Sequence, residues 1–294
     1  MRKLDRLGWA ESFTFESYGV RVGLRASRPG VLPALAEYLP PGWKPVTAGV
    51  VERLYSLVAA PDAPPGGRVR RFSLLYEGIL RIARTHELEE LFERFAADLH
   101  LYVAEAARRR VFVHAGVVGW RGRAIVLPGN SLSGKSTLVA ELVRAGATYY
   151  SDEYAVLDRR GRVHPFARPL GIRDTQSGRQ RRVTVESLDG TSGSRPLPVG
   201  LVVVSKYRPG SRWRPRRLSS GQGLLTLLSN TISVRRRPEA ALDALQQVTA
   251  GAPVIKSTRG EARAAAEAIL EAVESGPVAL GAKRFQPGPT TRPD

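Results

Sequence analysis

The segment Gly129–Ser136, GNSLSGKS, constrains the fold more than any other part of the chain. It matches the pattern G-x-x-x-x-G-K-[ST] at every fixed position. The apolar segment 123–129, RAIVLPG, precedes it, and the amphipathic segment 136–145 follows it. In a strand–loop–helix unit of this kind, glycines let the backbone wrap around phosphate groups, and the N-terminus of the helix adds positive potential. The sequence therefore predicts a phosphate-binding loop within an α/β domain.

The loop pattern also predicts which atoms contact a nucleotide. Lys135 is expected to reach the β- and γ-phosphates, and the Ser136 hydroxyl is expected to bind Mg²⁺. A Gly/Ser turn that only caps the helix is the alternative, but it gives no reason for Lys135 in this context. The predicted nucleotide-binding set is Gly129, Asn130, Ser131, Leu132, Ser133, Gly134, Lys135, Ser136 and Thr137.

Two adjacent acids, Asp152 and Glu153, follow the next strand-like segment. The helix after Ser136 rises about 15 Å over ten residues, at about 1.5 Å per residue. The segment 147–151 returns about 16 Å as a strand, at about 3.3 Å per residue. Asp152 is therefore expected beside the phosphates, at the sheet edge where open α/β sheets bind ligands. A carboxylate there can hold Mg²⁺ or accept a proton from an attacking hydroxyl, whereas a solvated strand end is the alternative.

Two other classes of nucleotide hydrolase fit the sequence poorly. A GTPase requires an N-K-x-D guanine-binding motif after an apolar strand, and VVVSKYR offers Lys206 without the aspartate. The segment 218–222, LSSGQ, resembles the transporter-ATPase signature. However, no apolar strand ending in an acid follows it. We interpret Ser219 or Ser220 as a helix cap.

The chain resembles the HPr kinase/phosphorylase catalytic domain and its wider group of HPr-kinase-like proteins, which are related in fold to phosphoenolpyruvate carboxykinase. The resemblance rests on the strand with His114-Ala115-Gly116, a second strand, the phosphate loop, a helix, and an acidic pair. Asp152 lies sixteen residues after the loop serine, as in that family. The resemblance covers about residues 111–272 well and residues 13–110 loosely. Over residues 13–110 the chain is similar to kinases that accompany peptide-modification pathways.

The resemblance implies roles for three residues. Asp152 would be the base that deprotonates the acceptor hydroxyl. Glu153 would be a carboxylate on the Mg²⁺ side, with Asp152 and Ser136 as further metal ligands. His114 would lie near the loop, in the catalytic set with Asp152 and Lys135, although an ordinary strand histidine is an equal alternative.

The sequence also departs from the bifunctional enzymes of that family. Their acidic pair is usually Asp-Asp in an Ala-Asp-Asp context, but here it is Ser151-Asp152-Glu153. Their Leu-Glu-x-Arg-Gly-Leu-Gly signature is absent, and RPLGIR (168–173) is only a partial counterpart. The sequence thus leaves open whether HPr is the substrate and whether phosphorolysis occurs.

Helix, strand and break patterns predict an α/β fold with three parts. Residues 1–110 form a smaller α+β region, 111–275 form the P-loop catalytic domain, and 276–294 form a flexible C-terminal tail rich in Gly and Pro. Apolar residues at spacings of three and four indicate a long helix over 87–110. The run 108–110 is expected in its last turn, where cations suit the helix dipole. Further helices are expected over 32–39, 221–230, 239–249 and 261–275, and a buried strand over 200–207.

The chain is strongly basic, with a net charge of +18 that includes 45 Lys and Arg residues against 27 acids. A basic surface attracts acidic or phosphate-rich partners. The clusters are scattered, with little aromatic interleaving, which favours a solvated surface or an acidic peptide over nucleic acid. The clusters are 68–71, 108–110, 179–182, 212–217 and 235–237, of which 179–182 is expected in a lid near the acceptor.

Other features of the sequence bear on the cell compartment and on the metal sites that can be expected. No apolar run approaches the roughly 20 residues that cross a bilayer. The first residues lack the apolar segment of a secretory signal. The chain has no cysteine, so we expect a cytoplasmic protein without disulfides, thiolate metal sites or membrane partners. His86, His100 and His164 are expected on a helix surface or in loops, without metal-ligand spacing.

Together these features predict an ATP- and Mg²⁺-dependent kinase that transfers the γ-phosphate to a hydroxyl. The expected acceptor is a serine of a protein or peptide, with an acidic sequence that the basic surface attracts. One alternative keeps the chemistry and takes free serine or a similar metabolite. Another is an RNA- or nucleotide-dependent binding module. The sequence decides neither the acceptor, nor ATP over GTP, nor the oligomeric state.

Overall fold

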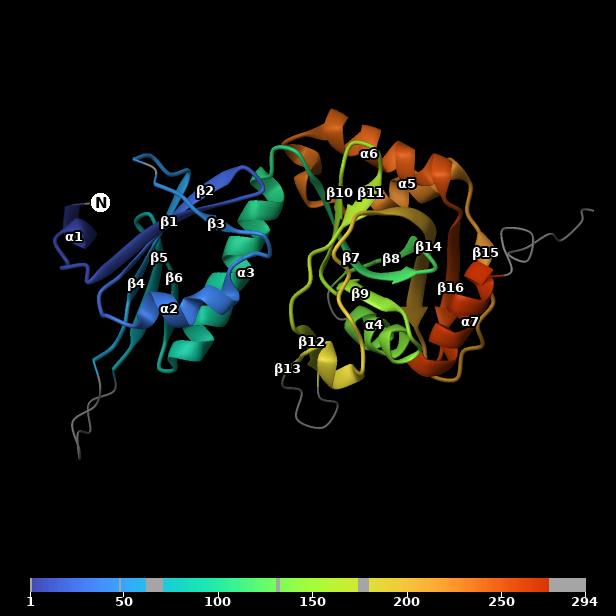
Figure 1. The fold of residues 1–294 in the computed structure, drawn as a ribbon, viewed down its shortest axis with the longest axis horizontal. Coiled ribbons are helices and arrows are strands. Elements are labelled where there is room, and N and C mark those ends of the chain that lie inside the picture. The colour runs from blue at the N-terminus through green and yellow to red at the C-terminus, as the bar shows by residue number, and fades with distance from the viewer. Residues whose placement is uncertain (1, 48, 62–70, 131–132, 174–179, 275–294) are drawn as a thin grey trace, which may run out of the picture. The chain divides into compact units, whose positions relative to one another are not determined.

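The computed structural model describes residues 2–47, 49–61, 71–130, 133–173 and 180–274 (Figure 1). The chain is a mixed α/β protein that divides into two compact units. The first comprises Met1–Phe112 together with Thr231–Ala241, and the second comprises Val113–Asn230 together with Leu242–Asp294. The sequence had placed residues 231–241 in the catalytic domain, so this segment is a correction to the predicted boundary. The predicted tail, 276–294, lies outside the described residues.

The first unit is built on a six-stranded sheet of order β3-β1-β2-β4-β5-β6. All neighbouring strands are antiparallel except β2 and β4. Apolar residues of α2 and α3 pack on the strands to form its core. The elements are α1 (Arg2–Asp5), β1 (Glu11–Ser17), β2 (Val20–Ala26), α2 (Val31–Leu35), η1 (Ala36–Tyr38), β3 (Lys44–Pro45), β4 (Arg53–Val58), β5 (Ser73–Glu77), β6 (Leu80–Thr85), α3 (Leu88–Ala106) and η3 (Ile232–Arg235).

The long helix α3 forms, but the arginines after it do not lie in its last turn. The helix ends at Ala106, and Ala107 turns the chain away with an extended ψ of 126°. Arg108 pairs instead with the Glu52 carboxylate. The carbonyl of Ala107 accepts a hydrogen bond from Arg237 Nη1 at 2.6 Å. The predicted dipole role of 108–110 is therefore wrong, and a distant arginine supplies the cation at this helix end.

Two of the three minor histidines are also placed differently from the prediction. His100 is buried within α3, and its Nε2 lies 3.0 Å from the Tyr38 carbonyl oxygen. His164 lies in β11 (Arg162–His164) and contacts Asp158. His86 is exposed just before α3, as expected. The periodic spacing of apolar residues in the helix does not show whether a histidine of that helix is buried or lies on the surface.

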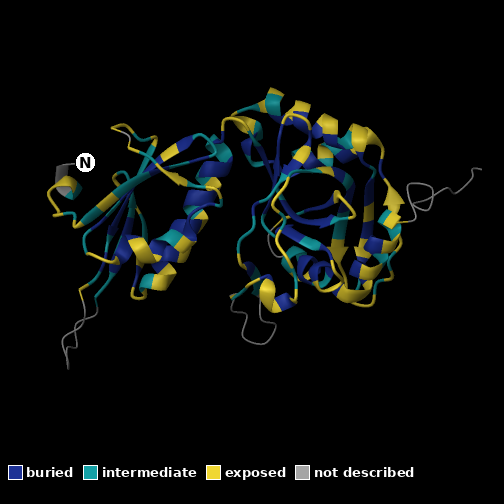
Figure 2. Cartoon of the chain, viewed as in Figure 1, coloured by how far each residue is buried: buried dark blue, intermediate teal, exposed yellow. Residues whose placement is uncertain are grey.

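The second unit contains an eight-stranded mixed sheet of order β11-β10-β7-β8-β14-β16-β15, with β9 paired to β7. Helices α4 and α7 cover one face with the main apolar core, and α5 and α6 cover the other (Figures 1 and 2). Its strands are β7 (Val111–Trp120), β8 (Arg123–Pro128), β9 (Thr148–Ser151), β10 (Tyr154–Leu157), β11 (Arg162–His164), β14 (Leu197–Tyr207), β15 (Arg216–Arg217) and β16 (Val254–Arg259). Its helices are α4 (Lys135–Arg144), η2 (Glu186–Leu188), α5 (Ser220–Leu228), α6 (Pro238–Gly251, which begins in the first unit) and α7 (Ala262–Glu274).

Local sequence explains the ends of several elements in this unit. Ser219 and Gln222 form a reciprocal capping box at the start of α5, which confirms the predicted cap. Pro238 opens α6, where its missing N–H costs no hydrogen bond. The strand predicted over 168–173 is shorter in the structure, where only Leu170–Arg173 forms β12. Strand β12 pairs antiparallel with β13 (Gln180–Val183). Within the predicted lid cluster 179–182, Arg181 and Arg182 therefore lie in a strand, while Arg179 lies outside the described residues.

Asp158 fixes the turn between β10 and β11. Its Oδ1 accepts hydrogen bonds from the backbone N–H groups of Arg160 and Arg162, at 2.9 and 3.0 Å. Its Oδ2 lies 3.1 Å from His164 Nε2 and 2.9 Å from Arg162 Nε. Burial alone would raise the pKa of Asp158, but these hydrogen bonds outweigh it and lower the pKa to about 2.

Asp158→Asn is expected to lower stability at pH 7 by about 2 kcal/mol, since each pKa unit corresponds to about 1.4 kcal/mol. A lowered acid pKa contributes stability above about pH 4, and that contribution is lost as the pH falls toward 2. Thermal unfolding from pH 7 to pH 2 should therefore show a gap between wild type and variant that closes in acid. A gap that stays constant over this range would contradict the ionised hydrogen-bonded carboxylate.

Candidate functional site

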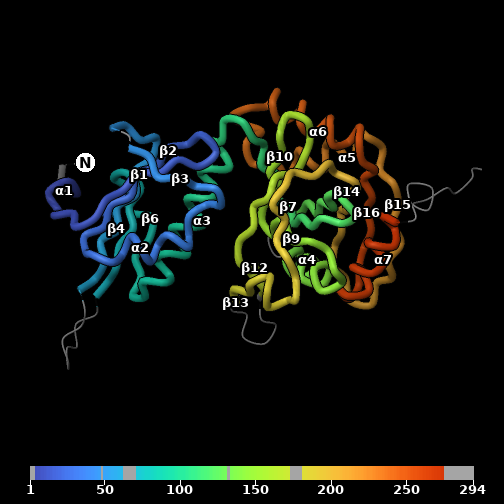
Figure 3. The backbone as a smooth tube through the Cα atoms, viewed as in Figure 1, coloured from blue at the N-terminus to red at the C-terminus, as the bar shows by residue number. Residues whose placement is uncertain are grey.

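The carboxyl ends of four strands of the second unit lie at one edge of the sheet. Strands β8, β14 and β16 are mutually parallel. Strands β8 and β9 both run antiparallel to β7, so they point in the same direction. This topology, visible in Figure 3, brings the residues that follow each strand to a common edge: Gly129 after β8, Asp152 after β9, Arg208 after β14 and Gly260 after β16.

The predicted phosphate loop occupies this edge between β8 and α4. Gly134 has a φ of 78°, a left-handed conformation that favours glycine, and it is the N-cap of α4. Lys135 Nζ donates a hydrogen bond to the Asn130 carbonyl at 2.7 Å. Burial lowers the pKa of Lys135 to about 8, against the opposing charges of Asp152 and Glu153. Ser131 and Leu132 lie outside the described residues, and Ser133, Ser136 and Thr137 flank Gly134 and Lys135.

Two groups that no sequence motif indicated hold Asp152 in place. The Tyr149 hydroxyl lies 3.1 Å from Asp152 Oδ1 and 2.8 Å from the Arg168 carbonyl oxygen. The Gly171 N–H donates to Asp152 Oδ2 at 3.0 Å. Burial raises the pKa of Tyr149 well above its usual value, so this phenol stays neutral. Both carboxylate oxygens are thus oriented and still have lone pairs free for a proton or a cation.

Glu153 differs from Asp152 in having a direct ion-pair partner. Its Oε2 accepts a hydrogen bond from Arg168 Nη1 at 2.7 Å. Burial raises the pKa of Glu153, while the Arg168 charge opposes that shift. The chain turns sharply here because the Ser151 hydroxyl accepts hydrogen bonds from the N–H groups of Glu153 and Tyr154, at 3.1 and 2.9 Å. The turn separates the directions of the two acidic side chains, so they have different partners.

His114 connects the loop with its surroundings through its backbone. Its carbonyl accepts a hydrogen bond from the Gly129 N–H at 3.2 Å, and its N–H donates to the Asn230 carbonyl at 2.7 Å. The next residue, Ala115, donates its N–H to the Glu153 carbonyl at 3.0 Å. Burial and the neighbouring Lys135 charge lower the pKa of His114 to about 4, so its imidazole is neutral at pH 7. His114 therefore lies near the loop, as the resemblance implied.

Arg259, at the end of β16, is a further residue of the site that the sequence analysis missed. Its side chain is buried, with only 3% of the residue exposed. Its Nη2 donates to the Gly134 carbonyl at 2.9 Å and reaches the Ser133 carbonyl at 3.4 Å. Within the described residues its Nε is buried without a hydrogen-bond acceptor. No motif distinguished Arg259 from the many other arginines, so only the folded strand order identifies it.

The described residues contain neither a preformed metal cluster nor a membrane-crossing helix. No three His, Asp or Glu side chains of this part of the chain gather into a metal-binding group. No helix in the same part combines the length and apolar character that a membrane span requires.

Comparison with known proteins gives little beyond the fold. No protein-family model matches the chain, and no curated protein matches it. Among solved structures, the HPr(Ser) kinase/phosphatase from Coxiella burnetii aligns over 56% of this chain and 94% of that chain. The identity is 15% and the TM-score is 0.31, so the match indicates only a distant structural relationship.

Proposed function

We propose that the protein is a phosphotransferase that uses ATP and Mg²⁺ to phosphorylate a hydroxyl, with serine of a protein or peptide as the acceptor class. One observation carries this proposal: the loop with Lys135 and the carboxylate of Asp152 meet at the same sheet edge, close enough for their charges to interact. In phosphoryl transfer, catalysis consists mostly of positioning and charge stabilisation. Lys135 would neutralise the transferred phosphate while Asp152 accepts the acceptor proton.

The residues at this edge also fit the magnesium nucleotide. Ser136 is the second residue of α4, directly after the loop, where a P-loop serine binds Mg²⁺ through its hydroxyl. Asp152 and Glu153 are the carboxylates that could complete the coordination, directly or through water. A bound Mg²⁺ would offset the negative charge of the phosphates. Lys135, with its loop N–H neighbours, would hold those phosphates, and Asp152 would orient the hydroxyl.

The test measures nucleotide binding and phosphate transfer separately. Isothermal titration with Mg²⁺ and a non-hydrolysable ATP analogue should give saturable binding. Mass spectrometry of serine-containing peptides incubated with enzyme and ATP should reveal a gain of one phosphate group, and this gain should require Mg²⁺. Phosphate on free serine with none on peptides would favour the metabolite kinase. Nucleotide binding without transfer to any hydroxyl would instead leave a nucleotide-dependent binding module.

Glu153→Gln is expected to raise the Mg²⁺ concentration for half-maximal rate about tenfold, because a neutral amide attracts a divalent cation less than a carboxylate does. The rate at saturating Mg²⁺ should change less. Arg168→Gln is the matched control, since it removes the ion-pair partner and leaves the carboxylate in place. A Mg²⁺ titration that is identical for wild type and Glu153→Gln would show that Glu153 serves only its ion pair with Arg168.

Arg259→Met is expected to weaken ATP-analogue binding about tenfold or more, because hydrogen bonds from a charged donor to the loop carbonyls are lost. Arg259 acts through the loop, so the KM for ATP should rise more than kcat falls. Arg263→Met is the control. Arg263 lies four residues after Arg259, and its side chain is 84% exposed, so this variant removes the same charge from the surface. Arg259→Lys should recover part of the affinity. Equal affinity of Arg259→Met and wild type would contradict this role.

A further inference from the structure

Three cations face the same side of the sheet on three neighbouring strands. Arg216 of β15 lies directly opposite Lys256 of β16 in antiparallel register. Lys206 of β14 is opposite Thr258, two residues beyond Lys256, and therefore on the same face. Like charges directly opposite each other destabilise a sheet. All three residues are exposed. The sheet thus carries an unfavourable charge arrangement that an anionic ligand would relieve.

The surroundings of this ladder are equally basic. The adjoining loop adds the exposed residues Arg208, Arg212 and Arg214. We call these arginines, together with Lys206, Arg216 and Lys256, the basic strip. Among the ion pairs of the described residues, none involves a member of the strip. Glu261, which follows β16, accepts a hydrogen bond from the Tyr207 hydroxyl at 3.2 Å.

The loop that carries the strip is fixed to the end of β16. The Arg208 N–H donates to the Arg259 carbonyl at 2.9 Å. The Arg214 N–H donates to the Ser257 hydroxyl at 3.0 Å. Gly260 leaves no room for a side chain there, because an added Cβ would lie 2.6 Å from the Ser211 carbonyl oxygen. The cations are therefore presented on an ordered backbone.

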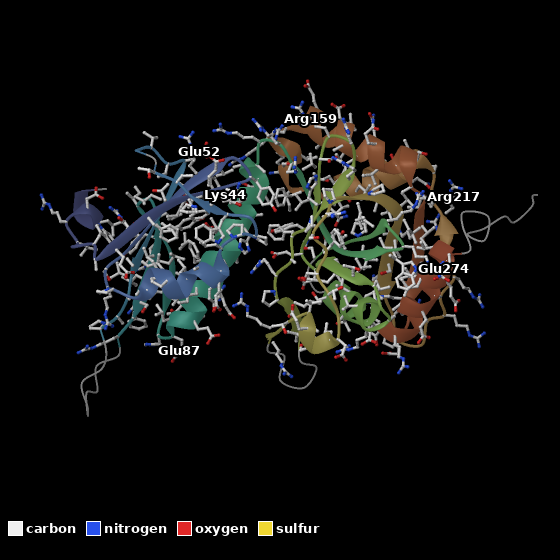
Figure 4. All side chains as sticks on the ribbon, viewed as in Figure 1. Lys44, Glu52, Glu87, Arg159, Arg217 and Glu274 are labelled. Atoms are coloured by element: carbon white, nitrogen blue, oxygen red, sulfur yellow. The ribbon has the colours of Figure 1, made fainter. Side chains whose placement is uncertain are left out.

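The strip also adjoins the candidate site. Tyr207, which follows Lys206, pairs in register with Arg259, whose side chain contacts the Gly134 carbonyl. From there the strip runs across the sheet to β15, which is the last strand in the sheet order. Figure 4 labels Arg217, which follows Arg216 in β15 and points to the opposite face by strand alternation. A ligand on the strip would thus extend from the carboxyl edge of the sheet, where the candidate site lies, toward the last strand, β15.

We propose that the basic strip binds an acidic peptide segment of the phosphate acceptor, an inference that rests on the proposed kinase function. An extended peptide can place carboxylates over Lys206, Lys256 and Arg216 while its serine lies at the loop. Nucleic acid fits this face less well, since single-stranded RNA is held by aromatic stacking as well as by charge. Tyr207 points to the opposite face, toward Arg259, and Trp213 packs against the core.

The experiment measures binding by fluorescence anisotropy at low and high salt, without ATP. The probes are a labelled peptide with one serine and a run of Asp and Glu, its Asn/Gln analogue, and a short single-stranded RNA. The variant is Lys206→Gln/Arg216→Gln/Lys256→Gln. The matched control, Arg81→Gln/Arg109→Gln/Arg159→Gln, removes three exposed cations that have no ion pair among the described residues. Thermal unfolding of both variants checks their folding.

We expect the strip variant to bind the acidic peptide about tenfold more weakly at low salt, while the control changes less than about twofold. High salt should remove most of that difference, because exposed charges are screened beyond about 8 Å at physiological ionic strength. The strip variant should unfold no earlier than wild type, since the like-charge pair is relieved. Equal losses in both variants, or equal binding of the neutral analogue, would overturn the proposal. So would RNA binding tighter than peptide binding that the strip variant abolishes.

Transfer assays separate this inference from the proposed function. If wild type binds the peptide through the strip but phosphorylates no hydroxyl, the peptide-binding role of the strip is supported and the kinase proposal fails. If wild type phosphorylates the peptide and the strip variant keeps the same acceptor KM, the kinase stands and the strip is overturned.

Discussion

Lys135→Ala is expected to reduce nucleotide-dependent phosphate transfer by about three orders of magnitude, the scale reported for removal of one preorganised charge-stabilising group. The Lys135 amine is partly buried beside the loop, and its Nζ bonds the Asn130 carbonyl. Burial lowers its pKa to about 8, so at pH 7 most of the population is still charged. Alanine leaves no cation at this position, and the transferred phosphate loses its nearest positive charge.

The variant should remain folded, since alanine is a good helix former at the first position of α4. Single-turnover transfer, nucleotide titration and thermal unfolding, measured together, separate a lost charge from a lost fold. Lys135→Arg keeps the charge and serves as the matched variant, with partial activity expected. Transfer by Lys135→Ala at the wild-type rate would show that the loop does not hold the reacting phosphate.

Asp152→Asn is expected to lower turnover by about two to four orders of magnitude, the usual contribution of a general base. ATP binding should be retained. The amide can keep the geometry of the carboxylate, because its oxygen can accept from the Gly171 N–H while its NH₂ donates to the Tyr149 hydroxyl. That hydroxyl is then free to donate to the Arg168 carbonyl. The variant thus removes the proton acceptor with little change in shape.

Tyr149→Phe is the matched control for Asp152, because it removes one hydrogen bond to the carboxylate and leaves the base in place. Its effect on turnover should be at least tenfold smaller. Rapid-quench measurement of the transfer step, with nucleotide affinity measured separately, distinguishes the two roles. If Asp152→Asn loses ATP binding but transfers the residual bound phosphate at an almost normal rate, Asp152 binds the metal and is not the base.

Much of the second unit follows from local patterns. Strand β7 contains the predicted strand segment His114-Ala115-Gly116, and β8 and α4 agree with the predicted segments 123–129 and 136–145 to within one residue. Dense apolar runs mark these elements. Gly122 follows β7 and Gly146 follows α4, and their φ values of 75° and 95° are in the left-handed region that favours glycine. Hydrophobic periodicity and glycine conformation act over a few residues, so they can be read without knowing the fold.

Local patterns failed where a contact with a distant segment decides the outcome. The arginines 108–110 have the composition of a helix C-terminus, but Ala107 ends the helix and Arg237 binds its carbonyl across 130 residues of sequence. His100 is polar in a helix, yet the Tyr38 carbonyl makes its burial tolerable. Similarly, the segment 231–241 packs with the first unit although it follows residues 113–230 of the second unit in the chain.

The sequence by itself determined the strand and the helix on either side of the predicted phosphate loop, and the place of the acidic pair beyond them. It did so because a helix and a returning strand have fixed rises per residue, which cancel between Ser136 and Asp152. Only the tertiary structure decided the partners of these residues. Gly171 lies 19 residues from Asp152, and Arg259 lies 125 residues from Gly134. The basic strip likewise depends on the order β14-β16-β15. Strand order is set by the packing of whole sheets, and no local spacing encodes it.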